Sequence, residues 1–261
     1  MKNTLFNPSR VRHHKKLGLH CVEQNSFLGN VVEDAFCTRL LCFGNPFKRI
    51  LLIGSFSDSF RHILCEKYAG AIFVHANSFL SSDSIDCLIE EDFLPFRPNE
   101  FDLILSHLTF HLVNDPQKVL QDLYKSLLPG GLFLSTFLGG NTLCEFRRLL
   151  LELELDQTKS ASQRIIPMID LKNAAALLQS AGFREPVTDQ ETVTASFSTL
   201  KRLRAFIKSM GEQAPFSQSS PLVPKNLFAR LEEEYQKRFS FEKEGLLVTF
   251  DLISFTGWKS L

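Results

Sequence analysis

Two histidines and an aspartate, His107, His111 and Asp115, lie four residues apart in the stretch SHLTFHLVND. On a helix, this spacing would bring two imidazoles and a carboxylate to one face, where they could bind a metal ion. An apolar run ends at Ser106, however, and Pro116 is placed to begin a helix, so we expect a loop or short turn between them. We therefore favour packing or hydrogen bonding of His111 near a pocket, and we predict no metal site.

Arg147 and Arg148 form a second group that could do binding chemistry. A guanidinium grips a carboxylate through two parallel hydrogen bonds, so these arginines could hold an acidic substrate group. Glu145 and Glu152 are near enough in sequence to share a solvated helix face with them. Both interpretations stay open.

The third candidate is the turn that follows the apolar run Arg49–Ile53 and begins at Gly54. Many α/β proteins cradle a nucleotide where a buried strand enters a glycine turn and then a helix. Such cradles usually contain several glycines, whereas Ser55–Ser59 contains none. The turn is therefore a nucleotide site, the remnant of one, or an ordinary strand-to-helix connection. The chain has no G-x-S-x-G, Walker or H-E-x-x-H pattern, which argues against common hydrolases, NTPases and metalloproteases.

The segments that must position these residues alternate between strand and helix patterns. The predicted strands cover residues 49–53, 71–75, 85–89, 101–106, 132–137, 186–195 and 246–258. The predicted helices cover residues 26–43, 57–68, 115–128, 170–181, 199–210 and 225–239. A further helix follows Thr142, which we expect to form a capping box with Glu145. Ser57 and Asp115 are expected to cap the helices that they begin.

This alternation predicts a parallel sheet that helices cover on both faces. Ligands bind beyond the carboxyl ends of the strands in such sheets. The order of the segments therefore places any site at Gly54, Asn77, Glu90–Asp92 and Ser106–His111.

The composition is that of a globular protein with a sizeable core, since 44% of the 261 residues are hydrophobic. Lys plus Arg and Asp plus Glu both number 29, and this balance argues against nucleic acid as the main partner. The six cysteines form no C-x-x-C pair, so we expect free thiols in a reducing compartment. No apolar run reaches the length of a membrane span, and we predict a cytoplasmic protein.

The stretch EEDFLPFRPNEFDLILSHLTFHLVNDPQKVLQDLYKSLLPGGLFLSTFLGG resembles the class I S-adenosylmethionine-dependent methyltransferases. GGNTLCEFR (Gly139–Arg147) and GWK (Gly257–Lys259) are similar to the branch of the complex I assembly factor and the malonyl-acyl-carrier-protein methyltransferase of biotin synthesis. The likeness includes the basic start LFNPSRVRHHKK, so we do not expect a cleaved transit peptide there. It implies a Rossmann-like α/β fold, with a seven-stranded, mostly parallel sheet and an antiparallel last strand. We expect a single domain over 1–261, with an N-terminal helical segment at 1–45 and a helical insertion at 199–240.

The resemblance also implies a cofactor, S-adenosylmethionine, and a motif from which this chain departs. In the family, the first strand ends in an acid and three alternating glycines, and a second acid holds the ribose. Here Leu52 replaces the first acid, Phe56 and Asp58 replace two glycines, and Asn77 replaces the ribose acid. Because a carboxylate hydrogen bond contributes about 1.5–3 kcal/mol, we expect cofactor binding to be weak or lost. The residues left to contact the cofactor are Gly54, Ser55, Asn77, Glu90, Glu91 and Ser106.

Phe56 is expected to block the pocket, with its ring either in the cofactor space or on the following helix. A buried phenyl ring is favourable by about 1.5–3 kcal/mol, so it would stabilise an emptied cleft. The alternative is that Phe56 packs with Phe60 and leaves the cleft open.

Two functions follow from these expectations. The first is a methyltransferase-like enzyme with a degenerate cofactor site that acts on a protein or carrier-protein substrate, with a possible role in respiratory complex I assembly. The second is a non-catalytic assembly protein that keeps the fold and binds a partner. The candidate catalytic residues are His111 and Arg147, since the related acyl-carrier enzymes have an arginine at the position of Arg147 that looks placed to meet an acidic group.

Overall fold

The computed structural model describes residues 4–19, 27–44, 46–79, 85–160, 162–218, 226–239 and 245–261. A seven-stranded sheet forms the centre of the molecule, with the spatial order β3-β2-β1-β4-β5-β7-β6. The strands are β1 (Arg49–Gly54), β2 (Ile72–Asn77), β3 (Cys87–Leu88), β4 (Phe101–His107), β5 (Leu127–Leu138), β6 (Arg184–Phe197) and β7 (Leu246–Trp258). The pairs from β3 to β5 are parallel, and β7 is antiparallel to both of its neighbours. The predicted sheet is confirmed.

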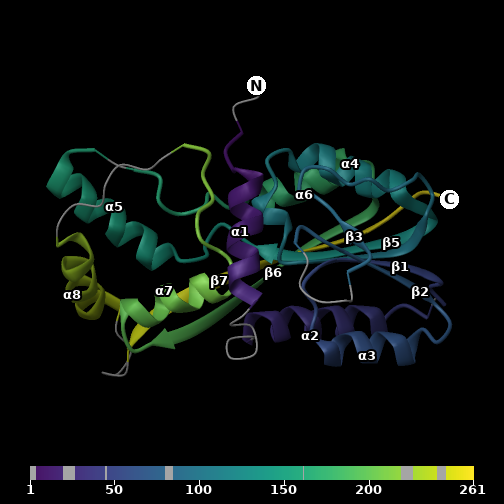
Figure 1. Cartoon of the computed structure of the whole chain (residues 1–261), viewed down its shortest axis with the longest axis horizontal. Helices are drawn as coiled ribbons and strands as arrows, with labels where there is room; N and C mark the ends of the chain where they lie inside the picture. Colours follow the sequence, from purple (N-terminus) through teal and green to yellow (C-terminus); the bar gives the residue numbers. More distant parts are fainter. Residues whose placement is uncertain are drawn as a thin grey trace.

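Helices cover both faces of the sheet, as the alternating sequence predicts (Figure 1). The helices are α1 (Pro8–Leu19), α2 (Phe27–Leu41), α3 (Asp58–Lys67), α4 (Pro116–Ser126), α5 (Cys144–Thr158), α6 (Leu171–Ser180), α7 (Leu200–Ser209) and α8 (Leu227–Phe239), with a short 3-10 helix, η2 (Phe110–Leu112). One apolar core joins α2 and α3 to the sheet and continues to α5, α7 and α8. A second core lies on the opposite face under α4 and α6. Among the described helices, none is long and apolar enough to cross a membrane.

The helix starts follow local sequence rules at four places. Ser57, Asp115, Asp170 and Thr199 each accept a hydrogen bond at the N-terminus of α3, α4, α6 and α7, and Pro116 is the first residue of α4. Such caps stabilise a helix by about 1 kcal/mol each. The predicted caps at Ser57 and Asp115 are therefore confirmed.

The predicted capping box at the start of α5 is wrong. Leu143 is the residue before the helix, has a left-handed φ of 57° and makes no side-chain cap. The Thr142 hydroxyl instead donates to the Asp251 carbonyl oxygen and accepts from the Asp251 amide, while the Glu145 carboxylate bonds to Thr249. Contacts with β7 thus replace the local cap.

The strand boundaries differ most from the predictions at β3 and β5. β3 covers only Cys87–Leu88, which is shorter than the predicted 85–89. β5 begins at Leu127 and includes Pro129-Gly130-Gly131, which we expected to precede the strand. The β4–β5 register shifts between Phe101 and Leu103, so this stretch continues the strand as an irregularity.

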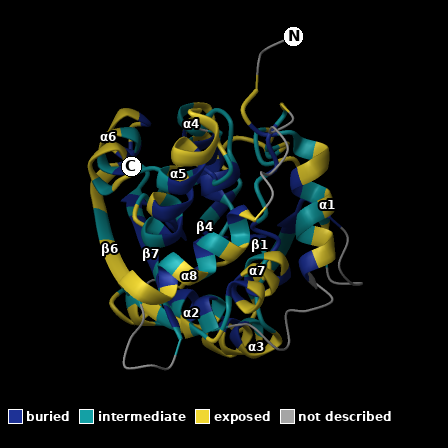
Figure 2. Cartoon of the chain, turned by 90° about the vertical axis from the view of Figure 1, so that its left-hand side faces the viewer, coloured by how far each residue is buried: buried dark blue, intermediate teal, exposed yellow. Residues whose placement is uncertain are grey.

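The C-terminal half builds a separate group of helices beside the sheet. α7 and α8 lie between β6 and β7 in the chain, and α5 packs against α8. Figure 2 shows this group from the front, with β6 as the exposed edge of the sheet. α1 packs against α7 and lies at one side of the molecule in Figure 2. The division of the chain into domains remains a prediction.

Candidate functional site at the carboxyl edge

A small cavity lies at the carboxyl ends of the central strands. Its volume is about 30 Å³, and the residues around it include Gly54, Asn77, Glu91 and Ser106. These are four of the six residues predicted to contact a cofactor, and the structure brings them together because their strands are parallel neighbours. Pockets for small molecules and cofactors usually measure about 300–1,000 Å³. The cavity between the described residues is therefore much smaller than a usual cofactor pocket.

At the end of β1, the backbone of Gly54 lies close to the end of β4. Gly54 has a φ of +103°, and a Cβ added there would lie 2.5 Å from the His107 carbonyl oxygen and 3.0 Å from Thr109 Cγ2. Glycine is thus required by the turn and by the approach of the β4 end. A side chain at this position would therefore meet the neighbouring strand, with which Gly54 pairs through His107.

The polar groups around the cavity are paired with one another. The Asn77 amide nitrogen donates to the Ser55 hydroxyl at 3.3 Å, and the Asn77 side-chain oxygen accepts from the backbone of Ser78. The hydroxyls of Ser106 and Thr109 lie 2.9 Å apart. The position that would hold a ribose therefore presents an amide that is already engaged.

The two glutamates of the acidic turn have different surroundings. Burial raises the pKa of the Glu91 carboxyl, although its hydrogen bond with Ser78 lowers it in part. Glu90 instead forms an ion pair with Arg12 of α1 at 3.2 Å and does not line the cavity.

The residues that replace the family motif belong to the core. Leu52 is 1% exposed within the main apolar cluster. The Phe56 ring stacks on Phe60, with centroids 5.5 Å apart, and also contacts His107 at 5.1 Å. Phe56 does not line the small cavity. Its ring lies on the following helix, which is one of the two positions expected for it, and it packs with Phe60 as in the alternative. Its role in blocking a ligand stays a prediction.

α2 forms hydrogen bonds with the turn that follows β1 and with the end of β4. The buried Glu33 carboxylate accepts hydrogen bonds from the Ser57 amide at 2.6 Å and from its hydroxyl at 2.5 Å. Burial raises the pKa of Glu33, whereas these bonds lower it. His107 Nε2 donates to the Gly29 carbonyl oxygen of the same helix at 3.4 Å, and burial lowers the pKa of His107 to about 4.

His111 is part of a buried charged cluster. Its Nε2 lies 2.6 Å from Glu212 Oε2, and Lys15 Nζ lies 2.5 Å from Glu212 Oε1. The Leu138 amide donates to His111 Nδ1 at 3.4 Å, so Nε2 carries the proton that faces Glu212. Burial would raise the pKa of Glu212, but His111 and Lys15 more than offset it and hold that pKa at about 2.

This cluster ties three distant segments together across the edge. Lys15 also donates to the Leu108 carbonyl oxygen at 3.1 Å, which anchors α1 over the end of β4. The His111 side chain is fully buried and both ring nitrogens are engaged, which is a positioning arrangement. No local sequence pattern indicated Lys15 or Glu212, because they lie 197 residues apart.

The other candidates lie away from the small cavity. Arg147 donates to the Gly140 carbonyl oxygen at 2.7 Å and so fastens the turn before α5. Arg148 pairs with Glu152 on the exposed face of α5. Asp115 caps α4, and the described ranges contain no His, Cys, Asp and Glu group suited to a metal ion.

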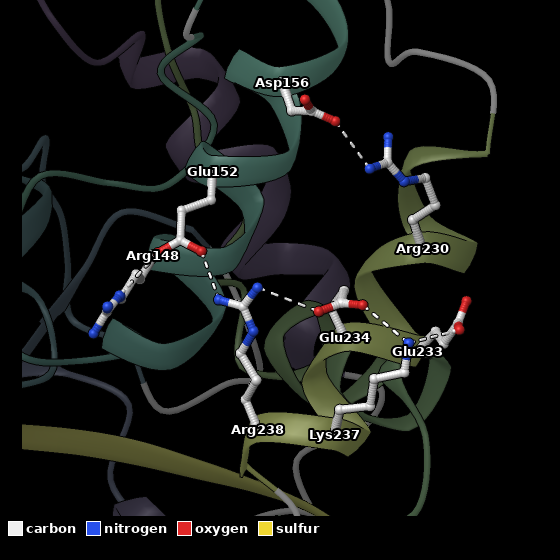
Figure 3. A network of polar contacts seen from close by, with 8 residues as sticks. All are labelled: Arg148, Glu152, Asp156, Arg230, Glu233, Glu234, Lys237 and Arg238. Atoms are coloured by element: carbon white, nitrogen blue, oxygen red, sulfur yellow. Dashed lines mark hydrogen bonds and ion pairs between the residues drawn. The ribbon is translucent and has the colours of Figure 1, made fainter.

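A larger pocket of about 380 Å³ lies among α5, α7, α8 and residues 164–168. Glu212 lines it, so the buried cluster separates this pocket from the carboxyl edge. Ion pairs on the outer side join α5 to α8, and Figure 3 shows them. Arg238 of α8 lies 2.7 Å from Glu152 of α5, and Arg230 lies 3.0 Å from Asp156.

Comparison with known proteins identifies the fold and the family. The fold resembles that of the YcgJ protein from Bacillus subtilis, with a TM-score of 0.57, 12% identity and coverage of 89% of this chain and 99% of that one. It also resembles Haemonchus contortus phosphoethanolamine N-methyltransferase 2 in complex with S-adenosyl-L-methionine, with a TM-score of 0.51, 16% identity and coverage of 87% and 53%.

Sequence relatives are closer. The mouse "Arginine-hydroxylase NDUFAF5, mitochondrial" is 29% identical over 67% of this chain and 51% of its own length, so the chain spans about half of that relative. A Rickettsia prowazekii (strain Madrid E) protein named "Putative methyltransferase RP459" is 33% identical over 69% of this chain and 80% of its own length. A family model described as a methyltransferase domain matches residues 71–135. The chain belongs to the class I S-adenosylmethionine-dependent methyltransferase-like family.

Proposed function

We propose that this methyltransferase-like protein binds S-adenosylmethionine weakly or not at all and works through a protein or carrier-protein partner, as an assembly or interaction protein. The observation that supports this proposal is the carboxyl edge: its cavity measures about 30 Å³, and the Asn77 amide there is engaged with Ser55 and Ser78. Without an acid at Asn77, the ribose hydroxyls lose a charge-assisted hydrogen bond worth about 1.5–3 kcal/mol.

The class of partner follows from the relatives. The malonyl-[acyl-carrier protein] O-methyltransferase 1 of Coxiella burnetii is 29% identical over 57% of this chain. The resemblance to the complex I assembly factor makes respiratory complex I a second source of partners. We further propose one domain with residues 199–240 inserted before the last strand, a cytoplasmic location and no nucleic-acid partner.

Calorimetric titration of the full chain with S-adenosylmethionine and S-adenosylhomocysteine tests the cofactor half of this proposal. We expect no saturable heat up to about 1 mM ligand, which corresponds to a binding free energy weaker than about −4 kcal/mol. The Asn77→Asp variant restores the ribose acid, and Gln179→Glu on exposed α6 is its charge-matched control. Micromolar binding by the unmodified chain would overturn the proposal.

The alternative is an enzyme with an altered cofactor site. The observation that favours it is the acidic turn, where Glu91 still borders the cavity next to Ser106. A gain of binding by Asn77→Asp alone, with none by Gln179→Glu, would show that only the ribose contact separates this chain from a binding site.

A further inference from the structure

The 380 Å³ pocket has an apolar interior. Its walls include Leu138, Phe146, Leu150, Ile165, Met168 and Phe250. The volume lies within the range of about 300–1,000 Å³ that is usual for small-molecule sites. An apolar interior of this size favours a ligand with a hydrocarbon part.

The charged groups inside the pocket are already neutralised. Arg164 lies 2.7 Å from Glu154, and Glu212 is paired with Lys15 and His111. These groups therefore offer little to a charged ligand, and the interior has no free charge among the residues that the structure describes.

The rim of the pocket is cationic. Lys201, Arg204 and Lys208 border it from one side of α7, at the three- and four-residue spacing that aligns side chains on a helix. Arg204 lies 4.6 Å from the centroid of the Phe228 ring of α8, which holds its guanidinium at the rim. Lys201 and Lys208 are exposed and form no ion pair with any residue in the described ranges.

A further hydrogen-bond donor lies in the same wall. Gln213 lines the pocket, and its Nε2 is buried without a hydrogen-bond partner among the described residues. Buried donors are nearly always paired, so an acceptor oxygen that reaches this position would satisfy it. Cations and an unpaired donor together favour a ligand with anionic oxygens.

We propose that this pocket binds an acyl chain with an anionic head group, with the hydrocarbon among α5, α7 and the 164–168 segment and the head at Lys201 and Lys208. A fatty carboxylate is the simplest such ligand. The inference does not rest on the proposed function, since no residue of the small cavity takes part in it.

Decanoate, titrated into the full chain by calorimetry below its micellar concentration, tests the proposal. We expect saturable binding, and binding of methyl decanoate that is weaker by about tenfold or more, because the ester lacks the charge-assisted contacts. Decanoyl phosphate, run in parallel, shows whether the head-group preference extends to phosphate. Equal affinity for decanoate and its methyl ester would overturn the assignment of the cationic rim, and absence of decanoate binding would overturn the pocket itself.

Two variants locate the site. The double variant Lys201→Gln, Lys208→Gln should weaken decanoate binding by about tenfold and leave methyl decanoate unchanged. Lys172→Gln, at an exposed position on α6, is the matched control and should change neither. Ala205→Trp places a large side chain in the pocket from an exposed position on α7 and should remove binding of both ligands, with thermal unfolding as the check on the fold. Decanoate binding that survives both sets of changes would place the ligand elsewhere and refute the proposal.

Discussion

The carboxyl edge of the sheet and the pocket beside α7 differ in their free volume and in whether their polar groups have partners. At the edge, the cavity is about 30 Å³, and the polar groups of Asn77 and Ser106 bond to the chain's own residues. The pocket is open on one side, has a volume of about 380 Å³ and is lined mainly by apolar side chains. Two lysines at its rim have no ion-pair partner among the described residues. A polar group that is satisfied internally gains little from a ligand, whereas an unpaired one gains a hydrogen bond.

The comparison shows that the carboxyl edge keeps the strand arrangement of the fold and has little free volume beside it. The parallel strands still end together, and Gly54 still makes its turn. The Gly54 backbone lies against its strand partner His107, and Lys15 anchors α1 over the end of β4. The larger pocket lies in the helical group of the second half, and ligand sites are also common between packed helices.

The strongest test of this division concerns Glu212, the buried glutamate that lines the larger pocket and pairs with His111 after β4. Glu212→Ala removes the carboxylate between Lys15 and His111 and leaves a buried lysine and imidazole without their partner. Breaking a buried ion pair in this way costs about 3–5 kcal/mol, so we expect a loss of that size in the free energy of unfolding in urea.

The control is Glu233→Gln on the exposed face of α8. Its ion pair with Lys237 is solvent-accessible, so this variant should unfold at nearly the same urea concentration as the unmodified chain. If both variants lose equal stability, the buried cluster does not join the two regions.

The second test uses pH. The pKa of His107 is about 4 in the folded protein and near 6.5 in an unfolded chain, because burial disfavours its charged form. The unfolded state therefore binds the proton first as pH falls, and stability should decrease by about 3 kcal/mol between pH 6.5 and pH 4. The pKa of Glu212 is about 2 in the folded protein and 4.5 in an unfolded chain. Protonation of Glu212 should therefore reduce the stability further, but only below about pH 4.5.

Urea unfolding of the His107→Gln variant at a series of pH values separates these two windows. The variant should lose the decrease between pH 6.5 and pH 4 and keep the decrease at lower pH. His62→Gln is the control, since His62 is an exposed imidazole on α3. An unchanged profile for His107→Gln would mean that the β4 end is not buried against α2 in solution.

The third test concerns the ring that replaces a family glycine. Phe56 is half-buried against Phe60 and His107, so Phe56→Ala should lower the free energy of unfolding by about 2 kcal/mol. The ring does not line the cavity, so its removal in Phe56→Ala should not improve the binding of S-adenosylmethionine. In the triple variant Phe56→Gly, Asp58→Gly, Asn77→Asp, loss of the ring should likewise contribute nothing to cofactor binding. Tighter binding of S-adenosylmethionine by Phe56→Ala alone would show that the ring does occupy the ligand space.

The sequence predicted what local rules and strand order determine. Ser57 and Asp115 cap their helices because their side chains reach amides only three residues away. Gly54, Asn77, Glu91 and Ser106 lie around one cavity because parallel strands end at the same edge. Neither inference needed a long-range contact.

What the sequence could not predict depends on contacts between distant segments. The capping box at Thr142 is overruled by Asp251, 109 residues away. The ion-pair partner of His111 is Glu212, from the segment after α7, and Glu212 also pairs with Lys15 of α1. Cavity volume is also set by packing rather than by motif. The family pattern pointed to Phe56 as the residue beside Gly54. In the structure, the residues closest to a Cβ at Gly54 are His107 and Thr109.

The smallest expected effect concerns the outer wall of the pocket. Arg238 bridges Glu152 of α5 and Glu234 of α8 at a partly exposed position (Figure 3). Exposed ion pairs contribute little and are screened by salt, so Arg238→Gln should shift the thermal midpoint only slightly, and the shift should vanish near 1 M salt, where the Debye length is about 3 Å. Leu153 and Leu231, which are buried on these helices, belong to the apolar core that joins α5 to α8.

The affinity for decanoate should be the same in Arg238→Gln as in the unmodified chain, because the network lies outside the pocket and not at its rim. A tenfold loss of affinity would show instead that these charges hold α8, and with it Phe228, in the position that closes the pocket.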